Sequence, residues 1–155
     1  MDIDIGIKKE DREDIAEKLQ VLLADTYNLY FKTHAYHWNV TGPRFQPLHD
    51  IFEQQYNELW TATDEIAERI RSLGFNAPIG WSDIEKRTTI TEDNGVPGAD
   101  TMIANLVKGH EALSRTAKTL VDAADKAGDT ATDDLVSPRV SYHEKTAWML
   151  RALLE

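Results

Sequence analysis

The sequence predicts an all-α protein that folds as a bundle of four long amphipathic helices. Apolar residues recur at spacings of three, four and seven along four segments, and no segment alternates polar and apolar residues like a strand. Glycine and proline turns separate the four segments. The chain has 155 residues, of which 41% are hydrophobic, which suits one domain with a single core. We therefore expect a single domain over residues 1–155, with residues 1–10 as a flexible tail.

The first two predicted helices are joined by a short turn. The first helix is stopped by Thr41-Gly42-Pro43, and the second runs from about Pro47 to Leu73 with Gly74 as its C-cap. The apolar positions of the first helix are Ile15, Leu19, Leu22, Leu23, Leu29 and Tyr30. Those of the second helix are Leu48, Phe52, Tyr56, Leu59, Ile66 and Ile70.

A longer connection, Phe75 to Pro97, separates the second helix from the third. It contains a Ser-x-x-Glu pattern at Ser82 and Glu85, which predicts a short helix opened by a capping box. One long crossover between the second and third helices is a known way to connect a four-helix bundle.

The third helix is predicted from about Asp100 to Lys126, ending at Gly128, and the fourth from about Thr132 to Leu154. Pro138 falls within the fourth pattern, where it costs an internal hydrogen bond unless it lies in the first turn. The start of the fourth helix is therefore left open. The apolar positions are Ile103, Leu106, Leu113, Leu120 and Val121 in the third helix, and Val136, Val140, Ala147, Leu150 and Leu154 in the fourth.

Charge and cysteine content narrow the classes of function. The chain has 17 basic and 27 acidic residues, a formal charge of −10, which disfavours phosphate-driven binding of nucleic acid. An acidic surface concentrates cations, although acidity also serves solubility alone. Without cysteine, a metal site must use histidine and carboxylate ligands. No apolar run is long enough to span a membrane and the N-terminus is acidic, so we expect a cytoplasmic protein without membrane partners.

The second helix carries two acid-containing pairs on one side. His49 and Glu53 are four residues apart, as are Asp64 and Glu68. At about 100° per residue, and with His49 as zero, Glu53, Asp64 and Glu68 fall at about 40°, 60° and 100° on the helical wheel. Two like charges four residues apart are unfavourable on an isolated helix, and a bound cation would remove that repulsion.

The two pairs cannot share an ion within one chain. His49 and Asp64 are separated by roughly 22 Å along the helix axis at 1.5 Å per residue. A second copy of the helix, antiparallel to the first about a two-fold axis near Glu58 and Leu59, would bring the histidine end of one chain against the acidic end of the other. Such isologous pairing is the commonest form of association. The pattern therefore predicts a dimer as a condition of metal binding.

His37 lies at the end of the first helix, where a short connection can place it beside His49. Two histidines and three carboxylates suit Fe(II), Mn(II) or Zn(II), and only the first two are redox-active. Each pair taken alone is also consistent with a solvated surface. Tyr56 and Trp60 lie close to His49 on the helical wheel, so part of this face is expected to be buried, which favours the metal or dimer interpretation.

These residues resemble the signature of the Dps-type mini-ferritins. The similarity rests on three blocks and on the spacing between them, and it extends over essentially the whole chain after residue 10. The blocks are His37-Trp38-Asn39-Val40-Thr41-Gly42, Leu48-His49-Asp50-Ile51-Phe52, and Asp64-Glu65-Ile66-Ala67-Glu68-Arg69 with Leu73-Gly74. The segment His143-Glu144-Lys145-Thr146-Ala147-Trp148-Met149 also resembles that family's last helix.

The resemblance implies a ferritin-like bundle and a ferroxidase that stores iron. Members of the family oxidise Fe(II), preferably with hydrogen peroxide, and hold ferric mineral inside a hollow dodecamer, which protects the cell from oxidative damage. The implied ligands are His37, His49 and Glu53 from one subunit and Asp64 and Glu68 from its two-fold mate. The family often has Asp at the position of Glu53, so the longer side chain here alters the expected coordination. Zn²⁺ or Mn²⁺ are expected substitutes for iron.

Two further roles follow from the resemblance alone. Trp38 would take up stray oxidising equivalents, although an aromatic residue at a helix end also serves packing. Pores at the three-fold axes would admit iron past acidic residues near the start of the last helix, namely Asp129, Asp133 and Asp134. The same acids can instead stabilise the start of that helix.

Three other functions compete with this interpretation. A larger ferritin or bacterioferritin subunit would carry Glu-x-x-His pairs, and none occurs here. DNA condensation with iron oxidation secondary would require a basic arm, yet residues 1–14 carry six acids against three bases, so direct DNA binding is disfavoured. A purely structural bundle would take up no iron.

Overall fold

The computed structural model describes residues 3–155 as an all-helical fold. The flexible-tail prediction for residues 1–10 falls partly on residues 1–2, which lie outside the described residues, and α1 begins at Lys9. The five helices are α1 (Lys9–Asn39), α2 (Phe45–Ser72), α3 (Trp81–Arg87), α4 (Ala99–Ala127) and α5 (Thr130–Arg151). The four long helices form a ferritin-like bundle, and α3 is the extra short helix in the crossover, as predicted.

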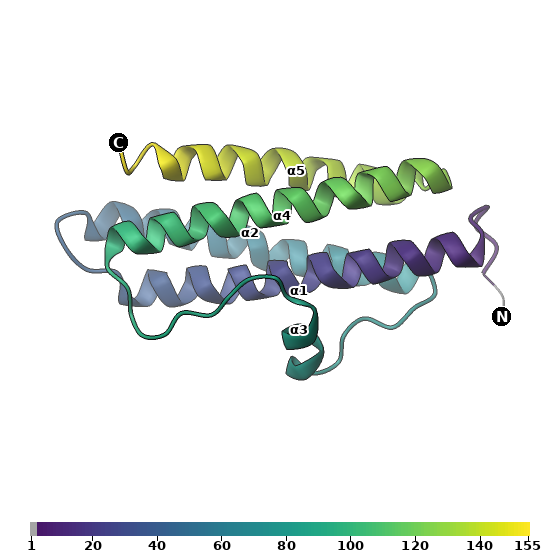
Figure 1. The fold of residues 1–155 in the computed structure, drawn as a ribbon, viewed down its shortest axis with the longest axis horizontal. Helices are drawn as coiled ribbons and strands as arrows, with labels where there is room; N and C mark the ends of the chain where they lie inside the picture. The colour runs from purple at the N-terminus through teal and green to yellow at the C-terminus, as the bar shows by residue number, and fades with distance from the viewer. Residues whose placement is uncertain (1–2) are drawn as a thin grey trace.

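The long helices form two antiparallel pairs, α1 with α2 and α4 with α5 (Figure 1). The connection through α3 returns along the outside of α1 to the end of the bundle where α2 began, so α2 and α4 run in the same direction. This crossover places the α1–α2 turn near the end of α5, where Arg44 Nη1 donates to the carbonyl of Leu153 at 3.0 Å. Among residues 3–155, no helix is both long and apolar enough to cross a membrane.

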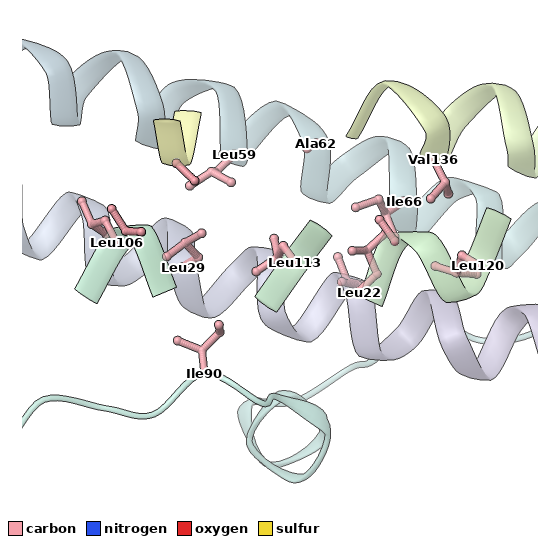
Figure 2. Close-up of a cluster of buried hydrophobic side chains, with 14 of the residues drawn as sticks. Leu22, Leu29, Leu59, Ala62, Ile66, Ile90, Leu106, Leu113, Leu120 and Val136 are labelled. Atoms are coloured by element: carbon pink, nitrogen blue, oxygen red, sulfur yellow. The ribbon is translucent and has the colours of Figure 1, made fainter. Parts of the chain in front are cut away.

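The core is filled by aliphatic side chains, several of which repeat every seven residues along α1, α2 and α4 (Figure 2). Leu22 and Leu29 of α1 belong to one cluster with residues of α2, α4 and α5, and Ile90 of the crossover joins it. Repeats of this kind keep one stripe of each helix facing its neighbours over the whole bundle. At Gly109 of α4 the backbone approaches α1 so closely that a Cβ atom would lie 2.5 Å from Cδ1 of Leu29.

Helix ends follow the sequence signals, with differences at two helix starts and at the end of α5, which stops at Arg151, three residues before the predicted Leu154. Gly74 and Gly128 have positive φ and close Schellman motifs, which confirms both predicted stops. The helix α2 begins at Phe45, two residues before the predicted start. The helix α5 begins at Thr130, so Pro138 lies inside it and not in its first turn.

The predicted capping box of α3 is wrong. The helix starts at Trp81 with Gly80 as N-cap, and no side chain caps it, so Ser82 already lies within the first turn. The path of the crossover is fixed instead by Asp25, a fully buried carboxylate of α1. Asp25 accepts hydrogen bonds from the hydroxyls of Thr88 and Thr89 at 2.9 and 2.8 Å and from the backbone N–H of Thr89.

Candidate metal site

The two predicted histidine ligands lie face to face at one end of the bundle. The ring centroids of His37 and His49 are 3.7 Å apart and their planes differ by 15°. Nδ1 of His37 lies 2.8 Å from the carbonyl oxygen of His49, and Nδ1 of His49 lies 2.8 Å from the carbonyl oxygen of His37. The two residues therefore hold each other through a reciprocal pair of hydrogen bonds.

These bonds fix the tautomer of both rings. A carbonyl oxygen only accepts, so each Nδ1 must carry the proton and donate. In the neutral imidazole the remaining nitrogen, Nε2, then holds a lone pair. Metal-binding histidines generally use this arrangement, in which a backbone carbonyl on one nitrogen orients the ring and raises the basicity of the other. Both histidines are thus prepared to bind a cation through Nε2.

The turn between α1 and α2 creates this pairing. His37 lies in the last turn of α1 and His49 in the second turn of α2. Gly42 has φ of 107°, a conformation that favours glycine, and its carbonyl accepts the N–H of Phe45 at 3.0 Å. The ring of Phe45 stacks on His49 with centroids 5.1 Å apart, which covers the outer face of that imidazole.

The three predicted carboxylate ligands lie along α2 and are exposed. Glu53 follows His49 by one turn, while Asp64 and Glu68 lie near the other end of the helix, roughly 22 and 28 Å from His49 along the axis. Within residues 3–155 of a single chain, no three His, Asp or Glu side chains lie close enough together to hold a metal ion. The structure therefore brings together His37 and His49 and leaves the acids of α2 apart from them.

Aromatic side chains surround both ends of this helix face. Trp38 is 58% exposed and its ring lies 4.2 Å from that of His34. Trp60 is 53% exposed and lines a groove of about 690 Å³ together with Asp64 and Trp81. The expected burial of the face near His49 is thus incomplete within one chain, and the groove beside Asp64 leaves room for side chains of a second copy.

The ring of His34 stacks on Tyr56, and its Nδ1 lies 3.3 Å from the hydroxyl of Tyr30. Burial and the neighbouring His37 lower the pKa of His34. The sequence does not predict this polar contact, because Tyr30 fits the apolar positions of the first helix. The four-residue spacing from Tyr30 to His34 was the available signal, since such pairs share a helix face.

The three acids near the start of α5 have different surroundings. Asp129 is buried, caps α5 through the N–H of Thr132 at 3.0 Å, and pairs with Arg69 of α2 at 2.6 Å. Burial acts to raise the pKa of Asp129, but hydrogen bonds from Arg69 and Thr132 outweigh it and hold the pKa below its usual range. Asp133 is half-buried and accepts from Ser137, whereas Asp134 is exposed.

A second polar cluster lies inside the bundle. His110 of α4 and His143 of α5 are fully buried, with their Nδ1 atoms 2.9 Å apart. Arg139 lies beside His143 and forms an ion pair with Glu58 of α2. Burial, followed by the charge of Arg139, lowers the pKa of His110 to about 3, and burial likewise holds the pKa of His143 well below its ordinary value. Both rings are therefore neutral at neutral pH.

Comparison with known proteins decides the family. The ferritin-like domain family matches residues 16–155, nearly the whole bundle. A DNA protection during starvation protein of Brevibacillus brevis is 36% identical over 141 residues, which cover 91% of this chain and 95% of that one. The chain is a Dps-type mini-ferritin of the ferritin-like family. A low temperature-induced protein of Nostoc is 42% identical over 99% of the mini-ferritin and 87% of the relative.

Solved structures agree with this assignment. The Dps protein of Vibrio cholerae O1, described as a member of a superfamily of ferritin-like diiron-carboxylate proteins, superposes with a TM-score of 0.94 at 31% identity. That similarity covers all of the mini-ferritin and 98% of the Vibrio chain. The Dps crystal structure from Bacillus brevis gives a TM-score of 0.92 at 34% identity over 96% of this chain and 100% of that one. The fold is therefore matched from α1 to α5.

Proposed function

We propose that the mini-ferritin is a ferroxidase whose iron site is shared between two subunits, and that it stores the ferric product. The reciprocal bonding of His37 and His49 is the observation that carries this proposal. It prepares two Nε2 ligands at one end of α2, and within residues 3–155 of one chain no group of three His, Asp or Glu side chains lies close enough together to hold a cation. Carboxylates near the other end of the same helix complete the site only if a second copy lies antiparallel.

The paired arrangement assigns each ligand a role. Nε2 of His37 and of His49, with Glu53, would hold Fe(II) from one subunit, and Asp64 and Glu68 would hold it from the mate. Imidazole and carboxylate together suit Fe(II), and the hard carboxylate oxygens stabilise the Fe(III) that forms. Zn²⁺ and Mn²⁺ fit the same ligand set and should compete with iron.

Oxidation at this site would use hydrogen peroxide, or oxygen in its place. One peroxide accepts two electrons and two protons to yield two waters while two Fe(II) ions become Fe(III). The reaction removes both reagents that generate hydroxyl radical, so its physiological value is protection from oxidative damage. The relatives and solved structures with Dps names support this general role.

Storage requires a closed assembly, and we propose the hollow dodecamer of the family built from two-fold dimers. Iron would enter along acidic surfaces near the start of α5. Of the three acids there, Asp134 is exposed and Asp133 is half-buried, whereas the carboxylate of Asp129 is already bonded to Arg69 and Thr132. We therefore assign uptake mainly to Asp133 and Asp134.

Anaerobic loading with Fe(II) followed by peroxide tests the proposal. The wild type should oxidise iron rapidly and keep it in solution, as seen in the ferric absorbance. His49→Ala and Asp64→Ala should each slow the reaction by more than tenfold although their positions are far apart on α2. Asp50→Asn is the matched control, because Asp50 is an exposed acid next to His49 whose carboxylate bonds to Gln46. Equal rates in all four proteins would overturn the proposal.

Direct DNA binding is a less favoured alternative that the names of several relatives suggest. The formal charge of −10 opposes it, because affinity for DNA depends on neutralising phosphates. A gel-shift measurement at low salt should show no retardation without divalent cations. Retardation in their absence would favour a nucleoid protein over an iron-handling one.

A further inference from the structure

Most of the oxidisable aromatic residues of the mini-ferritin gather on one side of α1 and α2. The chain has four tryptophans and five tyrosines, and three of the tyrosines and two of the tryptophans contact one another in this region. We call the central four rings, His37, Tyr56, Tyr30 and Trp60, the ring array. Its successive centroids are 5.2, 6.3 and 5.2 Å apart. Such spacings are those of packed aromatic pairs, so each ring of the array is in contact with the next.

The ring array joins the two half-sites of one subunit. It begins at His37, which stacks on His49, and ends at Trp60, which lines the same groove as Asp64. Trp60 precedes Asp64 by one helical turn, about 6 Å of rise. In the proposed dimer these two half-sites belong to different iron sites. The array therefore covers about 16 Å of the roughly 22 Å that separate the two half-sites along α2, and one further turn of the helix leads from Trp60 to Asp64.

Tyr30 has the partner that one-electron oxidation of a phenol requires. Loss of an electron makes the phenol O–H strongly acidic, so the proton must pass to a base within hydrogen-bond reach. Nδ1 of His34 lies 3.3 Å from the hydroxyl of Tyr30. The ring of His34 also stacks on Tyr56, with centroids 3.9 Å apart. Nδ1 of His34 is thus placed to accept the proton of Tyr30 and later to return it.

We infer that the ring array carries single electrons between the two iron sites of a dimer, so that one peroxide can oxidise two Fe(II) ions bound at different sites. This inference rests on the proposed function. It explains how two sites, each loaded with one Fe(II), could together reduce a two-electron oxidant without releasing hydroxyl radical.

The electrons and protons balance as follows. Fe(II) at the His37 and His49 site gives the first electron, the O–O bond of peroxide breaks, and one proton completes one water. The remaining one-electron oxidising equivalent takes an electron from Tyr30 through Tyr56 and a second proton from solvent, which completes the second water. The phenolic proton of Tyr30 moves to His34. Fe(II) at the site containing Asp64 then reduces Tyr30 through Trp60, and His34 returns the proton.

The test compares the wild type with Tyr30→Phe and Trp60→Phe in single turnovers, with one Fe(II) per site. In the wild type we expect about two Fe(II) oxidised per peroxide, little spin-trapped hydroxyl radical, and a transient tyrosyl radical in freeze-quenched samples by paramagnetic resonance. Tyr30→Phe should abolish that radical, lower the ratio toward one, and increase the spin adduct severalfold. Trp60→Phe should prolong the lifetime of the tyrosyl radical, because electron transfer from Fe(II) to Tyr30 is slowed.

Tyr36→Phe is the matched control, since Tyr36 lies on the same helix and outside the ring array, bonded to Asp93. It should behave as the wild type. Unchanged stoichiometry and spin adduct in both Tyr30→Phe and Trp60→Phe would overturn the ring-array inference and leave the ferroxidase intact. Failure of the wild type itself to oxidise iron faster than buffer would overturn the proposed function as well. If Tyr30→Phe fails to assemble, Trp60→Phe alone decides, because Trp60 is half exposed and its replacement retains a ring.

Discussion

His37 and His49 are bonded to each other's backbone, with both Nδ1-to-carbonyl distances at 2.8 Å. The relationship joins the last turn of α1 to the second turn of α2 and sets the chemical state of both rings before any cation arrives. A site organised in this way would lose little freedom on binding the proposed cation, because the rings are already oriented.

The first prediction concerns the tautomers. Both histidines should carry their proton on Nδ1 in the metal-free protein at neutral pH, since each Nδ1 faces a carbonyl oxygen. Nitrogen NMR of protein with labelled histidine distinguishes the two ring nitrogens, and His37→Gln and His49→Gln assign the signals. A proton on Nε2 of either ring would contradict the geometry on which the metal site depends.

The second prediction concerns acid stability. The folded pKa values of His110 and His143 lie below the unfolded value of about 6.5, so the unfolded chain binds more protons below that pH. Stability should be constant above about pH 7 and fall as the pH drops below 6.5, by about 1.4 kcal/mol per pH unit for each histidine. Urea unfolding followed by circular dichroism between pH 5 and 7.5 measures this slope.

A double variant, His110→Leu with His143→Leu, isolates the contribution of this pair to the slope. It removes both buried imidazoles together, so the hydrogen bond between His110 and His143 is lost without leaving either ring buried and unpaired. Arg139 keeps its ion pair with Glu58. The free energy of unfolding of the double variant should vary less with pH than that of the wild type. The same slope in both proteins would show that other groups control acid unfolding.

A third prediction separates structural from surface acids at the start of α5. Asp129→Ala removes an N-cap and leaves Arg69 without its carboxylate, and should lower the free energy of unfolding by about 1–3 kcal/mol. Asp134→Ala should change it by less than about 0.5 kcal/mol and should slow iron uptake. Denaturant unfolding and the rate of ferric absorbance are measured for both variants. If Asp129→Ala took up iron more slowly and kept the wild-type free energy of unfolding, iron entry would be assigned to Asp129 instead of Asp134.

The fourth prediction concerns the crossover. Asp25→Ala leaves three donors of Thr88 and Thr89 without their acceptor and should destabilise the fold by about 1–3 kcal/mol. The segment around α3 should then become sensitive to limited proteolysis, because Asp25 anchors it to α1. Asp122→Ala is the control, as Asp122 is exposed on α4. Equal protease resistance in the two variants would show that apolar packing alone holds the crossover.

The helices were predictable because their signals are local. Apolar spacing and the positive-φ glycines Gly74 and Gly128 specify where a helix buries its stripe and where it stops. The capping box at Ser82 failed because the neighbouring Gly80 is extended and takes the N-cap position, while Asp25 of α1 holds the crossover that α3 belongs to. A contact between residues more than 60 positions apart is not visible in a local pattern.

The candidate site likewise has a part that the sequence predicts and a part that it does not. The positions of His49 and Asp64 on one face of α2 follow from helical geometry, and so does the distance between them. The reciprocal bonds of His37 depend on the conformation of the turn at Gly42, which the sequence only suggests. Asp129 and Asp134 look alike in sequence, yet Arg69 of α2 approaches only the first.

Subunit complementation tests the shared site most directly. His49→Ala and Asp64→Ala subunits are unfolded together in equal amounts and refolded, and peroxide-dependent oxidation of Fe(II) is compared with that of each variant refolded alone. A mixed dimer holds one site with both defects and one intact site, so random pairing should restore about one quarter of the wild-type sites. Recovery to that level is the result we predict. A mixture no more active than its two parents would show that histidine and acidic ligands do not meet across a two-fold axis.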